Sequence, residues 1–203
     1  MSKNLLWSLI LLITLALFGM GIKPVQAETY VFDNGLNNNV AVPQIINHPE
    51  NLQYVYGILG SGEDLVDYYA LPFTEDVGQV NFELLVRDSV TNFRPTLIFV
   101  DPNQRGMQGQ IPFGFPPNLG GRVYPWESGE DIKQADNTMF ENFLVGPNFI
   151  RDLSANRYLL AVHDPSGKGG RDILHIGAKN LPESISDKFK AVLALIRIKF
   201  LLY

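Results

Sequence analysis

The chain has no cysteine among its 203 residues. This absence excludes disulfide bonds, thiolate catalysis and cysteine-ligated zinc. Positive charge is also scarce, because 16 Lys and Arg stand against 21 Asp and Glu, for a formal net charge of −5. Proteins that bind nucleic acid normally present a basic face. The composition therefore predicts no nucleic-acid partner.

The sequence also lacks the short motifs of common enzyme classes. It contains no Gly-x-Ser-x-Gly elbow, no His-Glu-x-x-His pair and no phosphate-binding glycine-rich loop. The three histidines, His48, His163 and His175, are scattered. His163 and His175 could face each other across a hairpin, but a metal site there would need a third ligand such as Asp164. We therefore predict a protein that is not an enzyme, with surface or cross-strand histidines.

Hydrophobic residues are abundant, at 46% of the chain, and many lie in the first 27 residues. Lys3 precedes an apolar stretch from Leu5 to Ile22, and small residues, Val25 and Ala27, occupy the −3 and −1 positions of a cleavage site. This layout predicts a signal peptide over 1–27 and an exported protein, periplasmic or extracellular. An uncleaved membrane anchor is the alternative. Without Lys3 and Lys23, 14 basic residues face 21 acidic ones, and an acidic, cysteine-free exported domain favours a bacterial setting.

Residues 28–180 are interpreted as one domain of short strands separated by turns. The predicted strands are Tyr54–Leu59, Val66–Phe73, Val80–Val86, Thr96–Val100, Tyr158–Val162 and Asp172–Gly177. We expect the last two to form a hairpin across Gly167–Gly170. No amphipathic helix separates consecutive strands, so the pattern predicts an all-β fold, an antiparallel β-sandwich.

A long segment rich in Gly, Pro and aromatic residues, 104–137, interrupts this pattern. Structureless loops of this length in a compact domain are usually functional or disordered, and we expect an ordered excursion over one end of the sandwich. Its aromatic and acidic side chains could form a sugar-stacking site. The predicted ligand-binding residues are Phe113, Phe115, Tyr124, Trp126, Glu127 and Asp131. The alternative is that the aromatic residues pin the loop to the sandwich.

One part of the sequence is similar to a known family. The order is Gly57-Ile-Leu, an acidic glycine turn, Asp67-Tyr-Tyr-Ala-Leu, and a later strand that ends in Asp101-Pro. This order resembles the bacterial pre-peptidase C-terminal domain over about 54–103, and again over 158–177. The resemblance implies a jelly-roll-like β-sandwich. Two residues separate Asp64 from Asp67 where the family usually has one, and the 104–137 insertion is foreign to it.

Acidic residues near the predicted strand ends form a candidate metal site. The predicted ligands are Glu63, Asp64, Asp67 and Asp101. Calcium takes six to eight oxygen ligands, including backbone carbonyls, and some domains of the resembled family bind it. Aspartates at turns also commonly cap the local backbone, which is the alternative. Calcium is the one cofactor that the sequence leaves open.

The C-terminal segment, 181–203, is both apolar and basic, with few helix breakers after Asp187. The predicted membrane-contact residues share one helical face and are Phe189, Val192, Leu193, Ile196, Phe200 and Tyr203. Arg197 and Lys199 interrupt the apolar run, which is too short to span a bilayer. We predict a helix that lies on an anionic membrane surface. Docking on the domain or on a partner, and a truncated reading frame, are the alternatives.

Together these features predict an exported, non-catalytic binding module of the bacterial envelope. Its expected ligand is a carbohydrate, an envelope polymer or a protein. The alternative is a structural or accessory domain of a membrane-associated complex that is contacted through the C-terminal helix.

Overall fold

The computed structural model describes residues 29–61, 65–90, 92–111, 119–127, 132–136 and 141–177. The predicted signal peptide over 1–27 and the predicted C-terminal helix over 181–203 therefore lie outside the described residues. The domain boundaries proposed at these two ends stay predictions.

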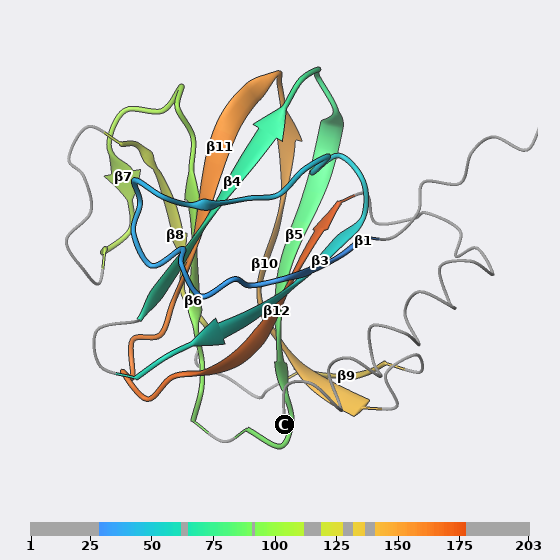
Figure 1. Cartoon of the computed structure of the whole chain (residues 1–203), viewed down its shortest axis with the longest axis vertical. Helices are drawn as coiled ribbons and strands as arrows, with labels where there is room; N and C mark the ends of the chain where they lie inside the picture. Colours follow the sequence, from blue (N-terminus) through green and yellow to red (C-terminus); the bar gives the residue numbers. More distant parts are fainter. Residues whose placement is uncertain are drawn as a thin grey trace, which may run out of the picture.

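The described strands form two six-stranded sheets, and all of these strands except β2 are labelled in Figure 1. Sheet A contains, in spatial order, β1 (Thr29–Phe32), β3 (Gln53–Leu59), β12 (Gly170–Gly177), β5 (Gly78–Arg87), β10 (Glu141–Leu153) and β9 (Ile132–Asp136). Sheet B contains β2 (Gln44–Ile45), β4 (Val66–Phe73), β11 (Asn156–His163), β6 (Thr96–Val100), β8 (Gly121–Tyr124) and β7 (Met107–Gln108). The prediction of an all-β fold is confirmed.

The two sheets share one hydrophobic core. Successive side chains of a strand point to opposite faces, and β5 turns alternate residues inward: Val80, Phe82, Leu84 and Val86 are all buried. Phe82 of sheet A meets Phe99 of sheet B, with ring centroids 5.5 Å apart. The core cluster contains residues of both sheets, so the sheets pack face to face as the sandwich prediction requires.

Three strand pairings are parallel, and here the prediction of an antiparallel sandwich is wrong. β1 pairs with β3, β2 with β4 and β7 with β8 in parallel, whereas the central pairings are antiparallel. The cause of the first two is the path of the chain, because β1 to β4 alternate between the sheets. A chain that crosses to the other sheet and then returns runs again in its original direction.

The predicted hairpin between the last two strands is also wrong. β11 pairs with β4 and β6 in sheet B, whereas β12 pairs with β3 and β5 in sheet A. The turn between them carries the chain from one sheet to the other. The two histidines that were expected to face each other are consequently apart: His163 lies opposite Val66 and Thr96, and His175 lies opposite Tyr54 and Glu83.

The segment 104–137 is not one excursion, because it contributes strands to both sheets. β7 and β8 extend sheet B and β9 extends sheet A. The 13-residue strand β10 was not among the predicted strands, since Gly146 and Pro147 interrupt its pattern. The register of β10 on β5 shifts between Val145 and Asn148. A β-bulge at this point lets the strand continue through residues that weaken a ladder.

Candidate functional site

Of the predicted sugar-stacking residues, Tyr124 is half-buried and contacts three described neighbours. Its ring stacks on Phe149, with centroids 3.9 Å apart and planes 7° apart. The Arg122 guanidinium lies 5.2 Å from the ring centroid, and the hydroxyl accepts a 2.8 Å hydrogen bond from Arg151. These contacts favour the interpretation that Tyr124 fixes its segment to sheet A.

Trp126 is held in a similar way. A Cβ atom at Gly146 would overlap the Trp126 ring, so the indole packs directly against the β10 backbone. The Arg94 guanidinium lies 5.1 Å from the ring centroid. Glu127 is exposed, and the other predicted members, Phe113, Phe115 and Asp131, lie outside the described residues. The structure therefore brings Tyr124 and Trp126 to the edge of the core.

The predicted calcium ligands are not brought together as one set. Glu63 and Asp64 lie outside the described residues. Asp67 is near the start of β4 and its register partner is Val162, whereas Asp101 follows the far end of β6. The Asp101 carboxylate accepts a 2.8 Å hydrogen bond from the backbone N–H of Asn103. Asp101 thus caps its own turn, which was the alternative interpretation.

Asp67 instead belongs to a buried polar cluster between the sheets. Its side chain is only 2% exposed, and Asn37 is similarly buried. Tyr69, two residues further along the same face of β4, is fully buried. Burial raises the pKa of the Tyr69 phenol well above its ordinary value, and the charges of Asp172, Asp67 and Asp33 raise it further, while the Asn37 amide opposes the shift. Three carboxylates therefore act on one buried hydroxyl.

Asp172 enters this cluster from sheet A. It shares the inward face of β12 with Leu174 and Ile176 and is 3% exposed. A Cβ atom at Gly57, its register partner on β3, would lie 2.9 Å from both carboxylate oxygens. Glycine at this position leaves the space that the carboxylate occupies.

Both carboxylate oxygens of Asp172 are buried without a hydrogen-bond partner. Burial, followed by the charge of Asp33, raises the pKa of Asp172 to about 7. An unpaired buried carboxylate is unfavourable because the charged form loses its hydration. Such a group is either protonated or balanced by a cation.

The cluster offers oxygen ligands of the kind that hard cations prefer. Besides carboxylates it contains the Asn37 amide and the Tyr69 hydroxyl, which are both buried. Within the described ranges, no three His, Asp or Glu side chains are arranged to hold a metal ion by themselves. A cation here would therefore complete its shell with amide, hydroxyl or water oxygens, as calcium does.

Sequence reasoning found Asp67 and missed Asp172 and Asn37. The signal for Asp172 was present, because an acidic residue in phase with the buried Leu174 and Ile176 must face the core. Asn37 lies in a loop between β1 and β2 and has no such periodic signal. Its position is fixed by its backbone carbonyl, which accepts a 2.8 Å hydrogen bond from the N–H of Tyr68.

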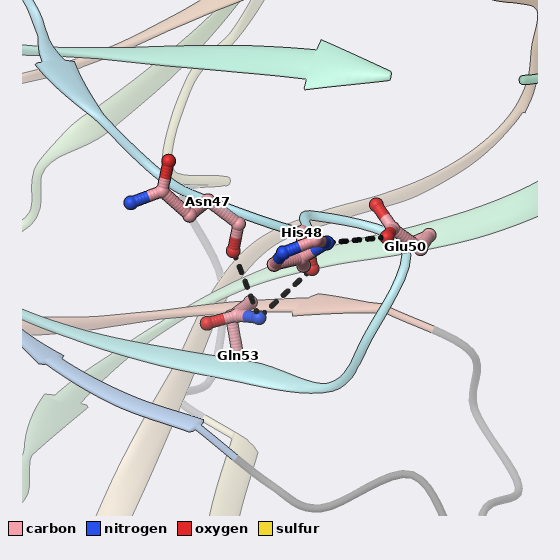
Figure 2. Close-up of polar contacts among 4 residues, drawn as sticks. All are labelled: Asn47, His48, Glu50 and Gln53. Carbon is pink, nitrogen blue, oxygen red and sulfur yellow. Dashed lines mark hydrogen bonds and ion pairs between the residues drawn. The ribbon is translucent and has the colours of Figure 1, made fainter. Parts of the chain in front are cut away.

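The three histidines lie in separate environments. Figure 2 shows His48 in a turn, where its Nδ1 lies 3.1 Å from Glu50 Oε1 and its carbonyl accepts a 2.9 Å hydrogen bond from the Gln53 amide. His175 stacks on Tyr54, with ring centroids 4.9 Å apart. Burial lowers the pKa of His163, and the charge of Asp164 opposes this.

Ser166 belongs to the turn that follows His163. Ser166 Oγ donates a hydrogen bond to the Asp164 carboxylate at 2.7 Å. The Asp164 carboxylate thus caps the turn over residues 164–169. Among the described residues, no helix has the length and apolar character needed to cross a membrane.

Comparison with known proteins gives structural neighbours only. No family model matches the chain and no curated protein matches it. The Yersinia pseudotuberculosis-derived mitogen is 11% identical, with a TM-score of 0.37 over 68% of this chain and 93% of that chain. CorA, described as a surface-associated copper-binding protein of Methylomicrobium album BG8, is 9% identical, with a TM-score of 0.33 over 70% of this chain and 98% of that chain.

A third neighbour is the pre-peptidase C-terminal domain of collagenase from Bacillus anthracis. It is 12% identical, with a TM-score of 0.35 over 74% of this chain and 95% of that chain. Backbones that overlap only to this extent establish nothing about the ligand or activity of this chain. The chain is thus similar to a solved domain of the family that its Tyr54–Asn103 pattern resembles.

Proposed function

We propose that the chain is an exported, non-catalytic binding module whose buried acidic cluster takes up a divalent cation, with calcium as the best chemical fit. The observation that carries this proposal is the Asp172 carboxylate, which is buried with neither oxygen hydrogen-bonded. Asp67 and Asn37, which act on Tyr69 together with Asp172, would supply further oxygen atoms. A hard cation with flexible coordination suits such a mixed set of oxygens.

The test is a thermal-unfolding titration of the full-length protein with CaCl₂, with MgCl₂ and with EDTA. A cation that binds only the folded state stabilises it by about 2.7 kcal/mol at 100 times its dissociation constant. We expect calcium to raise the melting temperature of the unsubstituted protein and of Asp101→Asn. Calcium should not change the melting temperature of Asp172→Asn. Equal shifts in all three proteins, or no shift in the unsubstituted protein, would refute the cation site.

The partner of the exported module is proposed to be a carbohydrate, an envelope polymer or an envelope protein. The support is the predicted signal sequence, the acidic composition and the absence of catalytic motifs. Glycan-array binding by the unsubstituted protein, compared with Tyr124→Ala and Trp126→Ala, tests the carbohydrate ligand. Binding that is unchanged in both variants would exclude these two rings as the stacking surface.

A further inference from the structure

The outward face of sheet A carries a continuous apolar row. The row has one residue from each strand, in spatial order Phe32, Tyr56, Ile173, Leu85, Val145 and Ile132, which the strand registers place side by side. We call these six residues the outer band. The outward face of a sandwich sheet is ordinarily polar, so an apolar row that crosses the whole sheet requires an explanation.

A second row beside the outer band is aromatic. Tyr30 stacks on Tyr54 with ring centroids 5.5 Å apart, and Tyr54 stacks on His175 at 4.9 Å. Within the outer band itself, Phe32 stacks on Tyr56 at 5.3 Å. These rings extend the apolar surface along β1, β3 and β12.

Sheet B shows what a covered outward face looks like in this protein. Its buried outward residues, among them Ile98 and Val100, cluster with Val40, Met107 and Leu119, which come from surrounding loops and the edge strand β7. On sheet A, by contrast, every described member of the corresponding cluster belongs to sheet A itself. Ile173 and Leu85 are nevertheless only 6% exposed, a degree of burial that a covering layer produces.

We propose that the C-terminal segment 178–203 is this layer and packs its apolar helical face on the outer band. The chain leaves the sheet at Gly177, the end of a strand that lies between β3 and β5. Twenty-six residues follow it. Gly177 is four residues beyond Ile173, about 13 Å along the strand. The ten residues 178–187 are long enough to lead the chain from Gly177 back to the outer band.

The dimensions of the two surfaces agree. A helix over Lys188–Tyr203 is about 24 Å long, and six strands are about 24 Å across. Its apolar face, from Phe189 through Leu193 to Phe200, continues along the whole helix. A helix that crosses the strands can therefore follow the outer band from one edge of sheet A to the other.

The charges are complementary as well. From Glu28 to Gly177 the chain has 9 basic and 19 acidic residues, whereas 178–203 has 5 basic and 2 acidic residues. Glu83 lies on the outward face of β5, opposite His175. A basic helix on an acidic domain is favoured electrostatically, as it would be on an anionic membrane. The apolar outer band, whose central residues are buried, favours the domain over a membrane as the surface that the helix contacts.

The absence of native cysteine allows a direct test by disulfide trapping in the full-length chain. Leu193→Cys, at the middle of the predicted helix, is combined in turn with Tyr56→Cys and with Val145→Cys, which flank the centre of the outer band. Leu193→Cys with Leu159→Cys, on the outward face of sheet B, is the matched control. Under mild oxidation we expect intramolecular disulfides in the first two proteins at about tenfold or greater excess over the control.

A second measurement uses no cysteine. Trypsin should cut after Lys190 slowly in the unsubstituted chain, and Leu193→Asp should accelerate that cut because it removes an apolar contact. Equal cutting in both chains would overturn the proposal, as would equal cross-linking to sheet A and sheet B. Cross-links that form only between chains would assign the band to a second copy. Co-flotation with phosphatidylethanolamine–phosphatidylglycerol vesicles, together with loss of the cross-links, would assign the helix to the membrane.

Discussion

Two buried aspartates of this protein differ in their hydrogen bonding. The Asp164 carboxylate accepts hydrogen bonds from Ser166, Lys168 and Gly169. Burial alone would raise its pKa, but these bonds outweigh the burial and lower it. Asp172 has no such donors, and its pKa rises to about 7. Hydrogen bonds thus lower the pKa of Asp164, whereas burial and the charge of Asp33 raise that of Asp172.

Replacing Asp172 by Asn should alter the pH dependence of stability in EDTA. The folded-state pKa of about 7 exceeds the unfolded value of about 4, so the folded protein binds the proton more tightly. The free energy of unfolding should therefore fall as pH rises from about 4 to about 7, by on the order of 4 kcal/mol. Asp172→Asn lacks this loss. Urea unfolding across this pH range measures it.

The quantity to compare is the difference in free energy of unfolding between the variant and the unsubstituted protein. It should favour the variant increasingly from pH 4 to pH 7 and become constant above this range. A difference that does not change with pH would mean that Asp172 is paired in solution. Asp101→Asn serves as the control, because its carboxylate caps an exposed turn.

Gly57→Ala should destabilise the protein through the same aspartate. The added Cβ would lie 2.9 Å from both Asp172 carboxylate oxygens, which is closer than real contacts allow. We expect a loss of about 1–3 kcal/mol in the free energy of unfolding, as for other overpacked sites. Chemical denaturation measures this loss.

A double-mutant comparison separates overpacking from backbone effects. In an Asp172→Ala background the clash is absent, so Gly57→Ala should cost clearly less there. An equal cost in both backgrounds would place the cause in the β3 backbone.

At the scale of elements, Gly146 of β10 leaves the space in which the Trp126 ring packs. The Trp126 ring lies directly against Gly146, beside the irregular register of this strand. Gly146→Ala should push the indole away, shift its fluorescence emission to the red and lower stability by about 1–3 kcal/mol. Asn148→Ala, an exposed position on the same strand, is the control. Unchanged emission in Gly146→Ala would contradict the packing described here.

The strands with a clear hydrophobic pattern were predictable from the sequence. Val66–Phe73 has the predicted bounds, and Thr96–Val100 does as well. Both are short runs that end at turn residues, so local chemistry fixes their limits. β10 was missed because Gly146 and Pro147 interrupt its pattern. The strands within 104–137 were missed because they have only two to five residues, and their neighbours in the sheet supply the pairing.

Pairing and the polar cluster were harder to predict for a different reason. A turn sequence such as Asp164-Pro-Ser-Gly167 reverses the chain, but it does not state whether the next strand joins the same sheet. The separation of Asp67 from Asp101, and the approach of Asp172 and Asp67 to Tyr69, depend on that choice. Both depend on which sheet each strand joins, and local patterns in a single sequence do not determine this.

At the scale of the whole molecule, aromatic contacts join the two sheets into one unit. Phe82→Ala removes the ring that meets Phe99 across the core and stacks on Phe149 at 4.9 Å. We expect a loss of about 3–5 kcal/mol, in a single transition detected equally by circular dichroism and by fluorescence. Ile150→Ala, an exposed site, should cost far less. Two separate transitions would show that the sheets unfold independently.

The order of strands in each sheet has a consequence for how the protein is made. β11 lies between β4 and β6, and β12 lies between β3 and β5, so both sheets receive an interior strand from residues 156–177. Until this part of the chain emerges during synthesis, four earlier strands lack a neighbour and expose edges that can pair with other chains. Folding of the domain is therefore delayed until residues 156–177 have been synthesised, and a partly made chain carries unpaired strand edges in both sheets.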